Sequence, residues 1–164
     1  MKKKVVLDTS FLITLTDRGR QHHAHACAYW EHFIARSIRM YIPTIVLSEY
    51  NIKGAIPGYV FDACILAPFN QDDAKCAGGL GVLLTQRERA GSDSPDLHPR
   101  VCLKDDIKII AQAVALSAEW VISDDHKTFH KFAQRAASMM LPRLRSLVLV
   151  DGFQDTEPQR SLGF

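Results

Sequence analysis

The sequence predicts an α/β protein in which helices cover both faces of a mainly parallel sheet, in three layers. Short continuous apolar runs alternate along the chain with longer segments whose apolar residues recur at helical spacing. Most of the short runs lack the alternation of a half-exposed strand, which is typical of parallel strands buried on both faces. Strand and helix alternate from the start, as crossover connections in a parallel sheet require.

The first half of the chain contains three expected strands and four expected helices. Pro43 favours a helix start directly after the second strand. The polar stretch 70–73 offers N-cap residues and acids for another helix start. We expect strands at 5–7, 40–42 and 64–69, and helices at about 10–16, 24–37, 44–51 and 71–89.

The second half begins with a polar stretch, "AGSDSPDLHPR" at 90–100, whose Gly, Pro and Ser residues predict a surface loop. Asp105 or Asp106 is then expected to cap a helix over 107–117. A strand at 120–122, a helix at 127–139 and a strand at 147–150 follow. With 164 residues, a single domain is the expected organisation. We place it at 1–151, with a loop insertion at about 90–103 and a loose C-terminal tail at 152–164.

The composition is that of a globular protein, and the start of the chain reads as mature sequence, so we expect the cytoplasm as its location. Hydrophobic residues make up 47% and charged residues 23%, and no apolar run reaches the ~18 residues needed to span a bilayer. The lysine-rich start resembles a signal peptide, but Asp8 interrupts the apolar run and no small-residue cleavage site follows. A net charge of +2 identifies no polyanionic partner. The four cysteines stand singly, which favours reduced, packed thiols.

Three acids are expected at one edge of the sheet. Asp8 and Asp125 directly follow expected strands, and Asp106 begins an expected helix. In parallel sheets the ligand crevice lies outside the carboxyl ends of the strands. A carboxylate buried there costs several kcal/mol unless a helix N-terminus or a metal ion compensates its charge.

Four segments in this order resemble the PIN-domain ribonucleases, most closely the VapC-type toxins of bacterial toxin-antitoxin pairs. The segments are "VVLDTSFLI", "PTIVLSEY", "KDDIKIIAQAVAL" and "VISDDHKTF". The resemblance runs from about 5 to 129 and implies a PIN-like fold. The positions that match the family pattern are Asp8, Glu49 after Ser48, Asp106, and Asp125 two residues after Ser123. Ser10 stands where many of these toxins have Asn.

The resemblance implies a metal site at these acids. Carboxylates brought together repel one another, and a divalent cation removes that penalty. Oxygen ligands favour Mg²⁺ or Mn²⁺. Asp8, Glu49 and Asp106 are the expected direct or water-bridged ligands, and Asp125 is expected to hold a ligand water or a second metal. Their neighbours Asp105 and Asp124 remain alternatives, and the hydroxyls of Thr9, Ser10 and Ser123 are expected to support the ligands.

The function implied is metal-dependent hydrolysis of RNA by an endoribonuclease. The resemblance also implies a small antitoxin partner and a homodimer. One rival is a catalytically silent PIN-like module that binds RNA or a protein. Another is a phosphohydrolase of the haloacid dehalogenase type, which needs a second acid two residues after the first Asp, where this chain has Ser10.

A histidine-rich stretch, "QHHAHACAYW", contains His22, His23 and His25. No acid or cysteine at ligand spacing is expected to complete a metal site there. We therefore expect a helix start that faces solvent or nucleic acid.

Overall fold

The chain folds around a five-stranded sheet in which all strands are parallel. The computed structural model describes residues 2–89 and 100–156, and describes side chains for 2–82 and 104–156. The strand order is β3-β2-β1-β4-β5. The strands are β1 (Lys4–Leu7), β2 (Arg39–Pro43), β3 (Cys64–Ala67), β4 (Trp120–Ser123) and β5 (Arg145–Val148). The predicted α/β class with its parallel sheet is confirmed.

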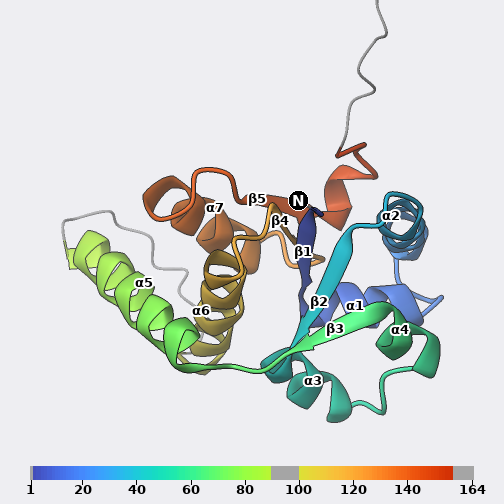
Figure 1. Ribbon diagram of the computed structural model, residues 1–164, viewed down its shortest axis with the longest axis horizontal. Coiled ribbons are helices and arrows are strands. Elements are labelled where there is room, and N and C mark those ends of the chain that lie inside the picture. Colours follow the sequence, from blue (N-terminus) through green and yellow to red (C-terminus); the bar gives the residue numbers. More distant parts are fainter. Residues whose placement is uncertain (1, 90–99, 157–164) are drawn as a thin grey trace, which may run out of the picture.

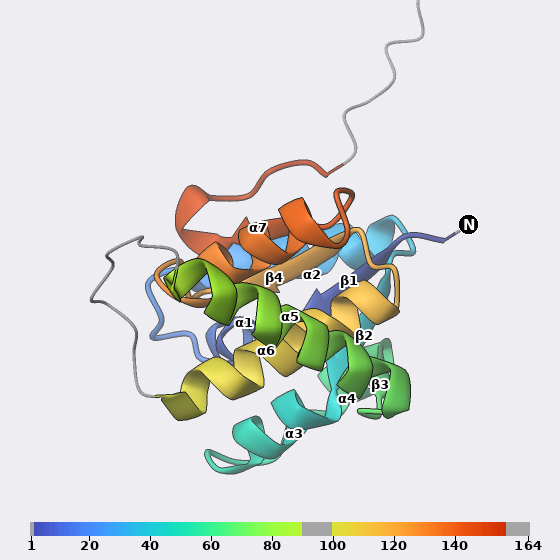
Figure 2. The same cartoon turned by 90° about the vertical axis from the view of Figure 1, so that its left-hand side faces the viewer.

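Helices flank the sheet on both sides. In Figure 1, α1 and α2 lie on one side of the sheet and α6 and α7 on the other, while α5 packs along α6 (Figure 2). The helices are α1 (Thr9–Thr16), α2 (His23–Ala35), α3 (Thr44–Asn51), α4 (Gly58–Ala63), α5 (Gln71–Arg89), α6 (Arg100–Ala115) and α7 (Phe129–Met139). None of these described helices is long and apolar enough to cross a membrane.

The central strands form the core, as their continuous apolar runs predicted. Val5, Val6 and Leu7 of β1 are fully buried, and Val121 and Ile122 of the neighbouring β4 are too. A strand with helices on both faces has no exposed side, so its side chains do not alternate. Strand order reverses between β1 and β4, because the chain goes first to one side of β1 and later to the other. The crevice between their carboxyl ends is where ligands bind in sheets of this kind.

The largest correction concerns α6, which begins at Arg100 and not after Asp105. Asp105 and Asp106 therefore lie inside a helix and cap nothing. The apolar spacing already starts at Leu103 and continues through Ile107 and Ile110, so the helical pattern reaches past the acid pair toward the N-terminus. Residues 100–103 of the expected loop belong to α6, and residues 90–99 lie outside the described residues.

Three smaller differences follow from local packing. The sequence reading missed α4, a six-residue helix after Pro57 that is too short to show a helical period. The last strand is displaced to Arg145–Val148, and a 3-10 turn, η1 (Leu149–Asp151), follows it. Helix α7 begins at Phe129, because the preceding residues form a turn closed by Asp125.

The start of the expected tail contacts α2. The hydroxyl of Tyr29, on α2, donates to the carbonyl of Gly152 (3.2 Å) and accepts from the amide of Gln154 (3.1 Å). The ring of Phe153 meets Tyr29 edge-on, with centroids 5.0 Å apart. A buried tyrosine hydroxyl needs a partner, and this segment supplies one. Residues 157–164 of the expected tail lie outside the described residues.

Candidate active site

Asp8 lies at the carboxyl end of β1, where α1 begins. Its amide donates to the carbonyl of Ile122 (3.0 Å), which fixes it beside β4. Its Oδ2 caps α1 by accepting from the amide of Ser10 (3.2 Å), and also accepts from the hydroxyls of Ser10 (2.6 Å) and Ser123 (2.9 Å). Only 6% of the residue is exposed. Burial raises the pKa of Asp8 even though these hydrogen bonds act in the opposite direction.

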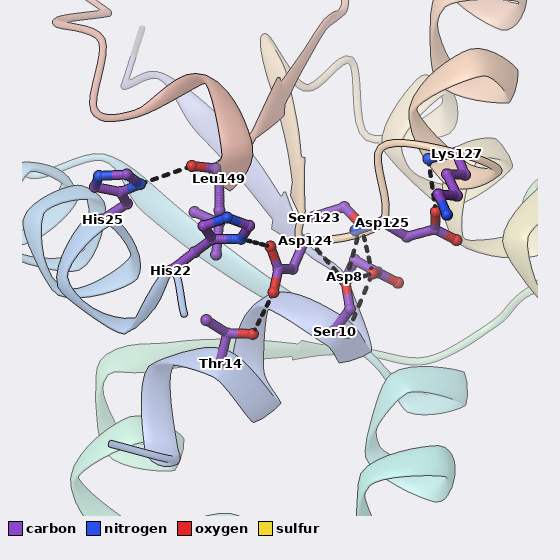
Figure 3. Close-up of polar contacts among 10 residues, drawn as sticks. All are labelled: Asp8, Ser10, Thr14, His22, His25, Ser123, Asp124, Asp125, Lys127 and Leu149. Carbon is purple, nitrogen blue, oxygen red and sulfur yellow. Dashed lines mark hydrogen bonds and ion pairs between the residues drawn. The ribbon is translucent and has the colours of Figure 1, made fainter. Parts of the chain in front are cut away.

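Ser10 and Ser123 form a pair of hydroxyls that orients Asp8 (Figure 3). Their oxygens lie 2.9 Å apart. The Oγ of Ser10 accepts from the amide of Asp124 (2.8 Å), and the Oγ of Ser123 accepts from the amide of Asp125 (2.9 Å). Each hydroxyl therefore donates its single proton to Asp8, and its oxygen accepts a hydrogen bond from a backbone amide just after β4. The pair joins β1, α1 and β4 around one carboxylate oxygen.

Glu49 comes to this site from α3. The hydroxyl of Thr9 donates to its Oε2. Burial raises the pKa of Glu49, and the negative charges of Asp8 and Asp105 raise it further, while the Thr9 hydrogen bond and the charge of Lys108 lower it. Helix α3 therefore places this acid among the carboxylates of β1 and α6.

Asp106 is the acid whose pKa is raised by the largest number of neighbouring acids. Burial raises the pKa of Asp106 to about 7, with further contributions from the negative charges of Asp8, Asp125, Glu49 and Asp105. These acids come from β1, α3, α6 and the turn after β4, so the fold brings four distant segments together. A carboxyl group whose pKa lies near neutrality costs free energy whenever it ionises at physiological pH.

The two acids of the Asp105–Asp106 doublet differ in their partners. Lys108 donates to Oδ1 of Asp105 across 2.7 Å, and both side chains are partly exposed, at 40% and 31%. Sequence reasoning missed Lys108 as a member of this site. Its spacing of three residues from Asp105 was a signal, since residues three apart on a helix lie on one face.

The two acids of the Asp124–Asp125 doublet have entirely different hydrogen-bond partners (Figure 3). Asp125 accepts from the amides of Lys127 and Thr128, both at 2.9 Å, and its charge contributes to the raised pKa of Asp106. Asp124 instead accepts from the hydroxyl of Thr14 (2.8 Å) and from Nδ1 of His22 (2.6 Å). Asp125 therefore belongs to the carboxylate group, whereas Asp124 joins α1 to the start of α2.

We had expected the three histidines at the start of α2 to face solvent or nucleic acid. Each of them instead forms a hydrogen bond with another part of the protein. His22 binds Asp124, and Nδ1 of His25 donates to the carbonyl of Leu149 (2.8 Å). The rings of His22 and His25 stack with centroids 6.0 Å apart. Nδ1 of His23 donates to the carbonyl of Thr14 (2.9 Å). Each ring therefore anchors the start of α2.

The donor set fits a hard divalent cation. Asp8, Glu49, Asp106 and Asp125 offer only oxygen, which suits Mg²⁺ or Mn²⁺. Burial and mutual repulsion raise the pKa values of Asp8, Glu49 and Asp106, and a bound cation would offset both effects. Within residues 2–82 and 104–156, no group of three or more His, Cys, Asp or Glu side chains is placed where it could hold a metal ion.

Comparisons with known proteins show the fold. No family model matches this sequence, and no curated protein matches it. Among solved structures, VapBC2 from Rickettsia felis, bound to a DNA fragment from its promoter, matches with a TM-score of 0.60 at 16% identity, over 87% of this chain and 96% of that one. DNA-bound VapBC from Salmonella typhimurium matches with a TM-score of 0.56 at 18% identity, over 91% and 99%.

A third structure is VapC20 of Mycobacterium tuberculosis, described as a toxin that cleaves the sarcin-ricin loop. It matches with a TM-score of 0.51 at 14% identity, over 80% of this chain and 94% of that one. At such low identities the likeness concerns the fold alone. The chain has the PIN fold of VapC toxins over most of its length.

Proposed function

We propose that this protein is a metal-dependent endoribonuclease that hydrolyses RNA phosphodiester bonds, and that it acts as the toxin of a toxin-antitoxin pair. The observation that carries the proposal is that acids from β1, α3, α6 and the turn after β4 meet closely enough for their charges, together with burial, to raise the pKa of Asp106. Such a group of acids destabilises the fold unless it has a ligand. Strongly perturbed acids that meet in the crevice of an α/β sheet are typical of a functional site.

Asp8, Glu49 and Asp106 would hold Mg²⁺ or Mn²⁺, and Asp125 would hold a ligand water or a second cation. When bound, the cation supplies charge neutralisation, activation of a water molecule and stabilisation of the leaving oxygen. Ser10 and Ser123 both donate to Oδ2 of Asp8 and would hold this carboxylate in place for the metal. Thr9 orients Glu49 through its hydrogen bond to Oε2.

Two lysines beside the acids are suited to hold the RNA backbone. Lys108 lies one helical turn from Asp105, and Lys127, which is exposed, follows Asp125 in the turn before α7. Lysines bind phosphate as point charges and position a nucleic acid without reading its sequence. The reacting phosphate would therefore lie between these cations and the metal-binding acids.

The structural relatives suggest a substrate and a partner. VapC20 is described as a toxin that cleaves the sarcin-ricin loop, and the Rickettsia and Salmonella proteins were crystallised as VapBC complexes on DNA. We propose a structured RNA loop as the substrate, because unpaired bases are accessible to side chains. We further propose a small antitoxin as partner, a homodimer as the assembly and the cytoplasm as the location.

Cleavage of RNA by the purified protein tests the proposal. Total RNA and a sarcin-ricin loop oligonucleotide are incubated with Mg²⁺, Mn²⁺ or EDTA, using wild type, Asp8→Asn and Asp106→Asn. The matched control is Asp72→Asn on α5, because the Asp72 side chain is 83% exposed and pairs only loosely with Lys75 (3.5 Å).

We expect metal-dependent cuts with wild type and Asp72→Asn, and at least about 100-fold slower cleavage with the other two variants. If the wild type and all variants are equally inert and no metal binds, the protein is a silent PIN-like binding module. Cleavage that persists unchanged in EDTA would also overturn the proposal.

A further inference from the structure

The amino ends of the strands form the edge of the sheet opposite the acids. All strands of a parallel sheet start at the same edge, and basic residues stand at the starts of three of them here. Lys4 begins β1 and Arg39 begins β2, side by side in the register of the sheet, and Arg145 begins β5. The sheet therefore separates charge, with cations at its amino edge and the acids of the candidate active site at its carboxyl edge.

A cavity of about 330 Å³ lies at this amino edge, beside the starts of β1, β4 and β5. Its cationic lining residues are Lys3, Arg143 and Arg145. Among the described residues that line it, Glu119 is the one acid. Oε2 of Glu119 accepts from the backbone amide of Lys4 across 2.7 Å, which compensates part of its charge. The cavity therefore carries a net positive charge.

The two arginines of the cavity are suited to bind phosphate. Arg143 and Arg145 are exposed, and within residues 2–82 and 104–156 neither side chain forms an ion pair. A planar guanidinium binds phosphate oxygens through two parallel hydrogen bonds. Trp120 also lines the cavity, and Nζ of Lys3 lies 5.3 Å from the centroid of its ring, which holds a third cation there. Cations around a concave site fit individual phosphate groups.

We propose that this amino edge is a second contact site for RNA, which binds the phosphate backbone through Arg143, Arg145 and Lys3 without reading its sequence. The choice of RNA rests on the proposed function, since acids at the carboxyl edge repel a polyanion that cations elsewhere attract. The strands have four or five residues, which separates the two edges by about 13–17 Å. A long RNA can contact both edges, whereas one or two nucleotides bound at the acids cannot.

RNA binding by the full-length protein in EDTA tests this site. The fluorescence anisotropy of a labelled single-stranded RNA is followed at several salt concentrations, and vesicles that contain phosphatidylserine are tested in parallel. One double variant combines Arg143→Gln with Arg145→Gln, and a second combines Arg143→Lys with Arg145→Lys and so keeps the charge. The matched control is Arg135→Gln, which removes an exposed arginine on α7 whose guanidinium lies 5.9 Å from the ring centroid of Phe132.

The salt dependence reports the number of phosphate contacts. For a single strand, the logarithm of the affinity falls with the logarithm of the salt concentration by about 0.7 per contact. We expect the double glutamine variant to bind at least about fivefold more weakly, with a slope shallower by about 1.4. The double lysine variant and Arg135→Gln should keep the wild-type slope.

Two results overturn the proposal. One is an affinity and a slope that stay at wild-type values in the double glutamine variant. The other is a wild type that binds no RNA in EDTA. If that wild type binds the vesicles through the two arginines, the edge is a membrane contact and not an RNA site.

Cleavage assays with Mg²⁺ or Mn²⁺ distinguish a failure of this site from a failure of the proposed nuclease. The double glutamine variant should lose at least about fivefold in kcat/KM on a long RNA, through KM, and lose less on a short one. RNA binding that requires the arginines, without any cleavage, would refute the nuclease and support the edge site. Wild-type binding and cleavage by this variant would refute the edge site alone.

Discussion

Asp124 follows β4 and Asp106 lies on α6, and their surroundings differ in the balance of charge. Asp124 is 16% exposed and accepts from Thr14 and from His22, across 2.8 Å and 2.6 Å. Asp106 lies among four other acids, and burial together with their charges raises its pKa to about 7. Asp124 therefore has hydrogen-bond donors for both of its oxygens, whereas Asp106 is surrounded by other negative charges.

The difference separates an acid that stabilises the fold from an acid that needs a ligand. A buried carboxylate with good donors joins elements, and here Asp124 joins α1, α2 and the end of β4. A group of neighbouring carboxylates costs stability through mutual repulsion, and a bound cation offsets that cost. The comparison therefore predicts opposite consequences for the removal of the two acids.

The largest effect should follow from Asp106→Asn, because it removes a metal ligand and a repulsive charge together. RNA cleavage should fall at least about 100-fold, the loss expected when a principal electrostatic contribution to catalysis is removed. Stability of the metal-free protein at pH 8 should rise, since the buried charge is gone. Both are measured on one preparation, by cleavage assay and urea unfolding. A variant with wild-type cleavage would break the comparison.

Asp124→Ala should act in the opposite sense, chiefly on stability. It leaves the hydroxyl of Thr14, a residue only 1% exposed, without its acceptor, and removes the partner of His22. We expect a loss of about 1–3 kcal/mol in the free energy of unfolding. The control is Asp124→Asn, which keeps a carbonyl oxygen as acceptor. A stability gain in Asp124→Ala would show that this acid is not compensated.

Metal binding should stabilise the wild type and Asp124→Asn, but not Asp106→Asn. At Mg²⁺ or Mn²⁺ concentrations of 10 to 100 times the dissociation constant, the expected gain is about 1.4–2.7 kcal/mol. Thermal unfolding with and without metal measures it. An equal gain in Asp106→Asn would place the metal elsewhere.

The pH dependence of the metal-free protein should show the smallest effect. Burial first, and neighbouring charges second, raise the pKa values of Asp106 and Glu49 in the folded state, and burial raises that of Asp8. The folded protein then binds protons more tightly than the unfolded chain. The resulting stability is fully present below about pH 4 and is lost as the pH rises through about 7.

For Asp106 we expect a loss of roughly 1–2 kcal/mol over this range, after allowance for solvent screening. Urea unfolding in EDTA at several pH values measures this loss, and Asp106→Asn should reduce it. A slope of the opposite sign in wild type would contradict the assignment of these acids as an uncompensated group.

Much of the fold could be predicted from the sequence, because buried parallel strands leave continuous apolar runs such as Val5–Leu7. Short helices and the exact ends of helices were harder to predict from the sequence. The six residues of α4 are too few to show a period, and α6 was started too late because Asp105 and Asp106 resemble helix caps. The N-cap signature and a metal-binding acid pair use the same residue type, so the sequence alone does not separate them.

The acids of the site could be placed by segment, but the roles within each doublet could not. Asp124 and Asp125 differ by one position, and only the fold directs one toward His22 and the other toward the turn before α7. The partners of Asp124 lie about a hundred residues away in the sequence, whereas Asp125 accepts from amides two and three residues further along the chain. The pairing of Lys108 with Asp105 depends on helical spacing, which the sequence does contain.

Binding of Mn²⁺, followed by the electron paramagnetic resonance signal of the free ion, tests the central claim most directly. The comparison uses wild type, Asp106→Asn and Asp124→Asn at one pH and salt concentration, without RNA. The account predicts that wild type and Asp124→Asn bind Mn²⁺ with similar affinity and that Asp106→Asn binds it at least tenfold more weakly. Equal binding by all three proteins, or no binding by the wild type, would contradict the account.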